Sequence, residues 1–90
     1  MKTLHLNLKA EYFAQIAAGS KSHEYRLCTA FWSKRLLGQS FDRIEIKKGY
    51  PKRGDVTRTI SRPWCGLEVQ TIQHRHFGSE PVQVFAIRVN

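Results

Sequence analysis

The chain has no long apolar segment and only two cysteines. No apolar run approaches the roughly 20 residues that span a bilayer, and polar residues interrupt the first nine positions too often for a signal peptide. Cys28 and Cys65 lack the C-x-x-C spacing of redox or metal pairs, so we expect two free, buried thiols in a reducing compartment, with a disulfide between them as the alternative. We therefore predict a cytoplasmic protein that does not contact a membrane.

Several enzyme motifs are also missing. The chain has no glycine-rich phosphate loop followed by Lys and Ser or Thr, and no Gly-x-Ser-x-Gly. Pro63-Trp64-Cys65 lacks the rest of a zinc-deaminase signature. His74-x-His76, with Cys65 or His23, has metal-ligand residue types without the tight pairs of zinc sites, and we expect these two histidines in an exposed basic turn. We predict neither a metal nor another cofactor.

Acidic residues are scarce. Seven Asp plus Glu oppose fifteen Lys plus Arg, for a formal net charge of +8. Residues 34–62 hold much of the excess, with nine basic and three acidic residues. A polyanion or a phosphate-bearing substrate is the expected partner, and a cationic face that only aids solubility is the alternative.

The length and the hydrophobic pattern indicate one small α+β domain, 1–90. Ninety residues are too few for two cores. Period-2 alternation predicts strands and period-3.6 spacing predicts helices. The expected strands are 4–8, 41–48, 56–60, 66–72 and 82–89, and the expected helices are 10–18, ending at Gly19, and 30–37, capped by Thr29. About five strands and two short helices suggest a small mixed or antiparallel β-barrel.

The polar segment between the two predicted helices carries the most chemistry. If residues 22–26 are extended, Glu24 and Arg26 share a face about 7 Å apart, while Tyr25 turns the other way into the core. Lys21 reaches the same place from the loop. A cation, a carboxylate and a guanidinium at the mouth of a barrel suit proton transfer, although the same spacing also suits a surface ion pair of little energetic value.

Gly19-x-Lys21-x-x-Glu24-x-Arg26 resembles the signature of the ASCH family, a branch of the PUA-like RNA-binding barrels. Similar pieces run along most of the chain. They are the opening Leu-x-Leu-x-Leu-Lys, Glu24-Tyr25-Arg26, Phe31-Trp32-x-x-Arg35-Leu36, Phe41-Asp42-x-Ile44, Gly49-Tyr50 and Val84-Phe85-Ala86-Ile87, as in the compact, phage-type members. The resemblance implies a PUA-like β-barrel whose cleft is lined by the motif.

The resemblance also implies chemistry. Members are associated with RNA binding, one branch with ribonuclease activity, and another with removal of acyl groups from the exocyclic amine of cytidine. In that amidohydrolase branch the motif lysine acts with a threonine and a more distant glutamate. Lys21 matches the lysine, Glu24 stands where the hydroxyl residue would be, and Glu68 is the candidate for the distant glutamate.

We therefore predict a small amidohydrolase acting on an acylated cytidine-type nucleoside, with Lys21 and Glu24 as the catalytic residues. The expected substrate-binding residues are Arg26, Tyr25, Trp32, Arg35, Lys48 and Tyr50. Two of them have structural alternatives, since Trp32 with Leu36 suits a core position and Tyr50 before Pro51 suits a turn. The alternative function is a non-catalytic RNA-binding module, or a ribonuclease, that uses the basic stretch Lys47 to Arg62.

Overall fold

The computed structural model describes residues 2–52 and 55–90. Arg53 and Gly54 of the predicted basic stretch lie outside the described residues. Within the described ranges there are six strands, two α-helices and two 3₁₀ turns. In chain order they are β1 (Thr3–Leu8), α1 (Ala10–Ala17), β2 (His23–Leu27), α2 (Ala30–Leu36), β3 (Arg43–Lys48), η1 (Val56–Arg58), β4 (Thr59–Pro63), β5 (Leu67–Ile72), η2 (Arg75–Phe77) and β6 (Val82–Arg88). The predicted α+β class and the two short helices are confirmed.

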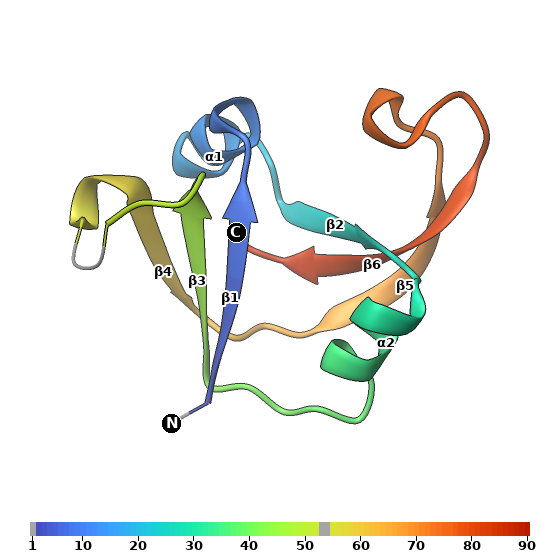
Figure 1. Ribbon diagram of the computed structural model, residues 1–90, viewed down its shortest axis with the longest axis horizontal. Helices are drawn as coiled ribbons and strands as arrows, with labels where there is room; N and C mark the ends of the chain where they lie inside the picture. The colour runs from blue at the N-terminus through green and yellow to red at the C-terminus, as the bar shows by residue number, and fades with distance from the viewer. Residues whose placement is uncertain (1, 53–54) are drawn as a thin grey trace.

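The strands form two three-stranded sheets. One sheet has the order β1-β3-β4, with β1 and β3 parallel and β4 antiparallel to β3; the other has the order β2-β6-β5 and is antiparallel throughout. The strands of the two sheets run at a steep angle to one another (Figure 1). Among the described residues the hydrogen-bonded strands do not close into a ring. They form two packed sheets, where a single barrel was expected.

The hydrophobic core fills the space between the inner faces of the two sheets. Its largest fully buried side chains include Leu6 and Ile44 from the first sheet and Phe85 and Ile87 from the second. Helix α1 adds Ile16, which is completely buried. Period-2 alternation in β1, β3 and β6 supplies these side chains, because alternate residues of a strand point to one face.

Three local expectations are corrected by the structure. Val56–Arg58 forms a 3₁₀ turn, held by the Asp55 side chain accepting from the Thr57 backbone N–H, and the strand follows only at Thr59. His23–Leu27 is a sixth strand, which its polar residues concealed. The two cysteines are free thiols, but Cys65 lies exposed after β4.

None of the described helices is long and apolar enough to cross a membrane.

The end of α1 positions the segment that carries the ASCH-like residues. The Ser20 N–H donates to the carbonyl of Gln15 and the Gly19 N–H donates to that of Ile16, both at 3.0 Å, which is the hydrogen-bond pattern of a Schellman C-cap. Gly19 adopts φ +79°, a left-handed conformation that costs a residue with a Cβ free energy. This cap turns the chain sharply from α1 toward β2.

We predict that Gly19→Ala lowers the free energy of unfolding by about 1 kcal/mol, because alanine tolerates the left-handed region poorly. No atom lies within 4 Å of the position a Cβ would take, so the cost is conformational and not steric. Urea unfolding followed by tryptophan fluorescence measures the change. Ala17→Gly, at the last residue of α1 and two residues before Gly19, measures the effect of a Gly–Ala exchange in the helix itself. An unchanged stability for Gly19→Ala would contradict the left-handed cap.

Candidate active site

Glu24 is the one charged residue buried in the part of the chain that the structure describes. Its exposed fraction is 5%, and it pairs across the ladder with the fully buried Ile87 of β6. Its side chain therefore belongs to the inner face of the second sheet, at the border of the core. A buried carboxylate is costly unless it is paired and hydrogen-bonded, so its neighbours decide how it is tolerated.

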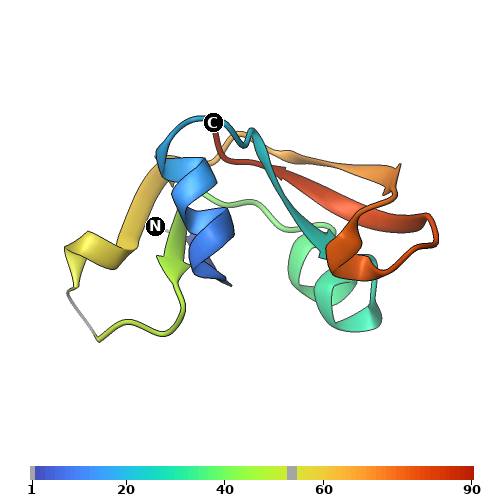
Figure 2. The same ribbon diagram turned by 90° about the horizontal axis from the view of Figure 1, so that it is seen from above.

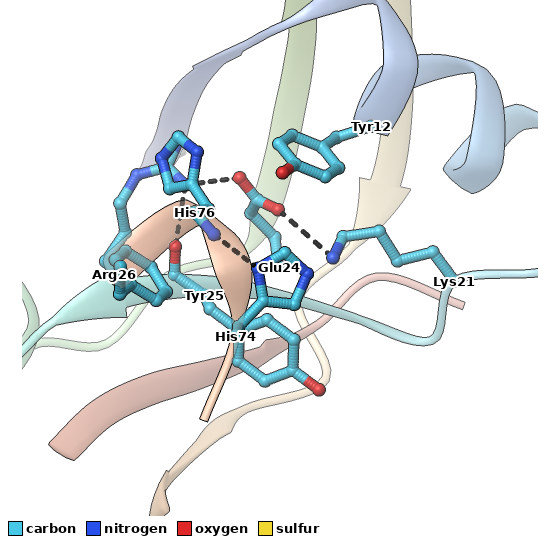
Figure 3. A pocket seen from close by; sticks show the side chains of 8 residues that line it. Tyr12, Lys21, Glu24, Tyr25, Arg26, His74 and His76 are labelled. Atoms are coloured by element: carbon cyan, nitrogen blue, oxygen red, sulfur yellow. Dashed lines mark hydrogen bonds and ion pairs between the residues drawn. The ribbon is translucent and has the colours of Figure 1, made fainter. Parts of the chain in front are cut away.

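Two cations hold the Glu24 carboxylate from opposite sides (Figure 3). The Lys21 Nζ lies 3.7 Å from Oε1, and Arg26 donates from Nη1 to Oε2. Their side chains are themselves only 13% and 16% exposed. Lys21 and Glu24 thus converge in a largely dry place, and the cluster carries one net positive charge that a substrate oxyanion or phosphate can complement.

Lys21 is fixed at both its backbone and its ammonium. The Asn90 side-chain amide donates to the Lys21 carbonyl at 2.8 Å, and the Lys21 N–H donates to Gln15 at 3.3 Å. The Lys21 Nζ lies 5.1 Å from the centroid of the Tyr12 ring and 4.8 Å from that of Tyr25. Two aromatic faces and one carboxylate therefore limit where the ammonium can move.

Arg26 connects the two sheets. Its Nη2 donates to the Asn7 carbonyl in β1 at 3.1 Å, while Nη1 donates to the carbonyl of Tyr25 at 2.9 Å as well as to Glu24. Its guanidinium carbon lies 5.3 Å from the Trp32 ring centroid. Thr29 caps α2 by accepting from the Trp32 N–H at 3.2 Å, which fixes the helix that carries this ring. Arg26 therefore orients the Glu24 carboxylate within a rigid frame.

A small pocket and a larger groove meet at this cluster. The pocket has a volume of about 30 Å³, and the groove has a volume of about 400 Å³ and opens to solvent. Both are lined by Tyr12, Glu24, Tyr25, Arg26, His76 and Phe77; Lys21 and His74 line the pocket, and Trp32 and Phe31 line the far end of the groove. The pocket has room for about one or two water molecules, and the groove is in the range of about 300 to 1,000 Å³ typical of small-molecule sites.

The turn between β5 and β6 forms one wall of the site. His74 caps η2 by accepting from the His76 N–H at 3.0 Å, and the Tyr12 and His76 rings meet edge to face at 5.6 Å. Helix α2 and η2 lie on the same side of the second sheet, both near the end at which β2 and β5 finish and β6 begins (Figures 1 and 2). The groove runs between them, with Phe77 from η2 as part of its lining.

Sequence reasoning missed this wall. We expected His74 and His76 in an exposed basic turn and weighed them only as metal ligands. His76 is largely exposed, yet it lines both hollows, and the half-buried His74 lines the pocket. The concentration of imidazole and aromatic residues in His74-Arg75-His76-Phe77, directly before the final strand, is the signal that marks the turn as part of a site. Tyr12 of α1 also belongs to this site, because its ring faces the Lys21 ammonium.

Burial lowers the pKa of the His76 imidazole below its ordinary value. The Lys9 ammonium lowers this pKa further, the Glu24 carboxylate acts in the opposite direction, and His74 and Arg26 add small lowering effects. The imidazole is therefore held in its neutral form near pH 7, where one ring nitrogen donates and the other accepts a hydrogen bond.

The structure brings some of the predicted site residues together and separates others. Lys21, Glu24, Arg26 and Trp32 all border the groove or its pocket. Tyr25 does so as well, but the prediction that it turns into the core is wrong, because its half-buried ring lies beside the Lys21 ammonium. Trp32 both packs on the core and lines the groove.

Arg35, Lys48 and Tyr50 lie outside the groove. Arg35 stacks on Phe31 and faces a separate hollow. Lys48 ends β3 in the other sheet, and Tyr50 follows it with 91% of its surface exposed. Lys48 pairs with Leu8, which lines the groove, but neither Lys48 nor Tyr50 is among the lining residues.

Glu68 does not supply a second carboxylate. It is exposed on β5, accepts from the Gln70 amide at 2.9 Å and lines a different hollow with His23 and Cys65. Within residues 2–52 and 55–90, Glu24 is the only carboxylate that lines the groove or the pocket. Over the same ranges, no three His, Cys, Asp or Glu side chains cluster so as to hold a metal ion.

Comparisons with family models, with curated proteins and with solved structures found no match to this chain.

We predict that Glu24→Gln lowers the free energy of unfolding by about 3 kcal/mol, because it leaves two partly buried cations facing each other without a carboxylate. Urea unfolding at pH 7 measures the change. Glu68→Gln is the matched control, and we expect it to change stability by less than about 0.5 kcal/mol because that carboxylate is exposed. Equal effects in the two variants would mean that Glu24 is not needed to balance Lys21 and Arg26.

We predict that the His76 imidazole titrates below its ordinary pKa of 6.5 in the folded protein. The folded state then binds fewer protons here than the unfolded chain, so this group reduces stability as the pH falls through 6.5. Lys9→Gln should raise the midpoint by removing a repulsive charge, whereas Lys48→Gln should leave it in place. Histidine ring resonances followed by NMR across pH measure both, and a wild-type midpoint at or above 6.5 would refute the assignment.

Proposed function

We propose that the protein is a small amidohydrolase of the ASCH type that removes the acyl group from the exocyclic amine of an acylated cytidine. The observation that carries this proposal is the convergence of the Lys21 ammonium and the Glu24 carboxylate, 3.7 Å apart, beneath an open groove. An acid or base and an electrophile side by side, largely shielded from water, are what amide hydrolysis requires.

The shape and lining of the groove support a planar heterocyclic substrate. Trp32 from α2 and Phe77 from η2 line it with apolar ring surface, and base–aromatic stacking contributes about 1 to 3 kcal/mol per base. The neutral imidazole of His76 offers one donor and one acceptor to the polar edge of a base. Convergent polar groups among aromatic walls are the usual composition of a small-molecule site.

In the proposed reaction, Glu24 accepts a proton from a water molecule as the water oxygen bonds to the acyl carbon. Lys21 stabilises the oxyanion that develops on the former carbonyl oxygen, and Arg26 keeps the carboxylate aligned by holding Oε2. The bond between the acyl carbon and the exocyclic nitrogen then breaks, and Glu24 returns the proton to that nitrogen. The products are a carboxylic acid and cytidine.

The resemblance to the ASCH family supports the same assignment, because Lys21, Glu24 and Arg26 come from the segment that carries it. Glu24 in place of a hydroxyl residue favours general-base attack by water over a covalent intermediate on the enzyme. As part of this proposal, the two sheets correspond to the halves of a PUA-like mixed barrel.

The alternative of an RNA-binding module or ribonuclease centred on Lys47 to Arg62 has less support. Among the described residues of that stretch, none lines the groove, and the exposed Arg58 pairs with Asp55 at 3.7 Å. The described cations of the stretch lie on β3, β4, η1 and the loop after β3, and the first sheet borders the groove only through Asn7 and Leu8 of β1.

We predict that the protein hydrolyses acetylcytidine and that Lys21→Gln and Glu24→Gln each reduce kcat at least 100-fold, since each removes one member of the reactive pair. Release of cytidine, followed by liquid chromatography under conditions where circular dichroism shows each variant folded, measures the rates.

Lys48→Gln serves as the control for the lysine, because it removes the same charge outside the groove. Its rate should stay within twofold of the wild type. An inactive wild type, or a loss of the same size in Lys48→Gln, would argue against hydrolysis at this site.

A further inference from the structure

A second hollow lies next to the groove, on the other side of Phe31. It has a volume of about 590 Å³ and is bordered by α2, by the start of β1 and by the segment leading into β3. Its wall includes the cationic and aromatic side chains of Lys2, Phe31, Lys34, Arg35 and Phe41, which we call the Phe31 face. No Asp or Glu is among the described residues that line it.

The Phe31 face combines two aromatic rings, the exposed Phe31 and the half-buried Phe41, with a cation lying over each. The Arg35 guanidinium carbon lies 4.4 Å from the centroid of Phe31, which is 57% exposed. The Lys2 Nζ lies 5.1 Å from the Phe41 ring centroid. The carboxylate of Asp42 accepts from the Lys2 backbone N–H at 2.7 Å and is therefore already engaged. Positive charge alternating with stacking surface is the composition of single-strand nucleic-acid sites.

The Phe31 face is continuous with the groove. Phe31 lines both hollows, and its ring meets that of Trp32 edge to face at 5.2 Å. A ligand that extends from a base near Glu24 past Trp32 therefore reaches Phe31 first and then Arg35 and Lys34. A free nucleoside would occupy only the groove and would leave this face without a role.

We propose that the Phe31 face binds the phosphates and one neighbouring base of a single-stranded oligonucleotide whose acylated cytidine occupies the groove. This inference rests on the proposed function, since it names the substrate class of the same site. A single strand is required because a base held in a duplex stack cannot enter a protein groove for chemistry on its exocyclic nitrogen. Arg35 suits a phosphate because its planar guanidinium offers paired donors while it stays stacked on the ring.

The first experiment measures binding without chemistry. A fluorescein-labelled oligocytidine of eight nucleotides, as RNA and as DNA, is titrated by fluorescence anisotropy at several salt concentrations. Three phosphate contacts predict that the logarithm of the binding constant falls with the logarithm of the salt concentration with a slope of about −2 for a single strand. Arg35→Gln should reduce the magnitude of this slope by about 0.7 and weaken binding about tenfold at low salt. Comparing the RNA and DNA arms identifies which strand the face prefers.

Arg58→Gln is the matched control, because it removes an exposed arginine from the basic stretch Lys47 to Arg62. We expect its affinity to stay within twofold of the wild type. A larger loss in Arg58→Gln than in Arg35→Gln would overturn the proposal in favour of the basic stretch. Displacement of the strand by polyglutamate of equal charge would overturn it in favour of an acidic protein partner.

The second experiment measures turnover as the ratio of kcat/KM for an acetylated cytidine within a short oligonucleotide to that for free acetylcytidine. Arg35→Gln should lower this ratio about tenfold, mainly through KM. An unchanged ratio with active enzyme would refute the Phe31 face and leave the hydrolase standing. Absence of turnover on both substrates, with strand binding that still depends on Arg35, would refute the hydrolase and support the face as a binding site.

Discussion

The Glu24 carboxylate, placed at the edge of the core between the side chains of Lys21 and Arg26, constrains the rest of this structure. Carboxylates are rarely buried, and this one is tolerated because a cation approaches each of its oxygens. Two local features place these cations beside Glu24. The sharp turn after α1 positions Lys21, and the extended conformation of β2 puts Arg26 on the same side as Glu24. The polar segment is therefore part of what holds the fold, and under the proposed function it also carries the reactive pair.

The same interaction adds polar contacts between parts of the fold that also meet in the hydrophobic core. Arg26 reaches from the second sheet to a carbonyl of β1 in the first, and the loop that carries Lys21 is held by the side chain of Asn90. The groove is thus assembled from both sheets, both helices and the η2 turn. Such a site is rigid where it holds the reactive groups and open where a ligand enters, which is the arrangement that preorganised catalysis requires.

Aromatic side chains divide the surface around this cluster into two compartments. Tyr12 and Tyr25 confine the Lys21 ammonium, while Trp32 and Phe31 form a continuous ridge between the groove and the neighbouring basic hollow. The positive charge of the chain is consequently not spread evenly over the surface. Part of it is neutralised at Glu24, part lies on the first sheet away from the groove, and part lies on α2, where Lys34 and Arg35 line the hollow next to the groove.

Several features follow from the sequence alone because local physics determines them. Alternation predicted β1, β3 and β6, Gly19 and Thr29 marked helix boundaries, and the i, i+3 and i, i+5 relation of Lys21 to Glu24 and Arg26 indicated a charged cluster. Tertiary packing decided the remainder. The pairing order that puts Lys48 in one sheet and Glu24 in the other is long-range and leaves no local trace. The composition of residues 74–77 is a local signal, but long-range packing decides that this turn covers the pocket. Local spacing determines which side chains of one segment share a face, whereas only the packing of distant segments determines what that face meets.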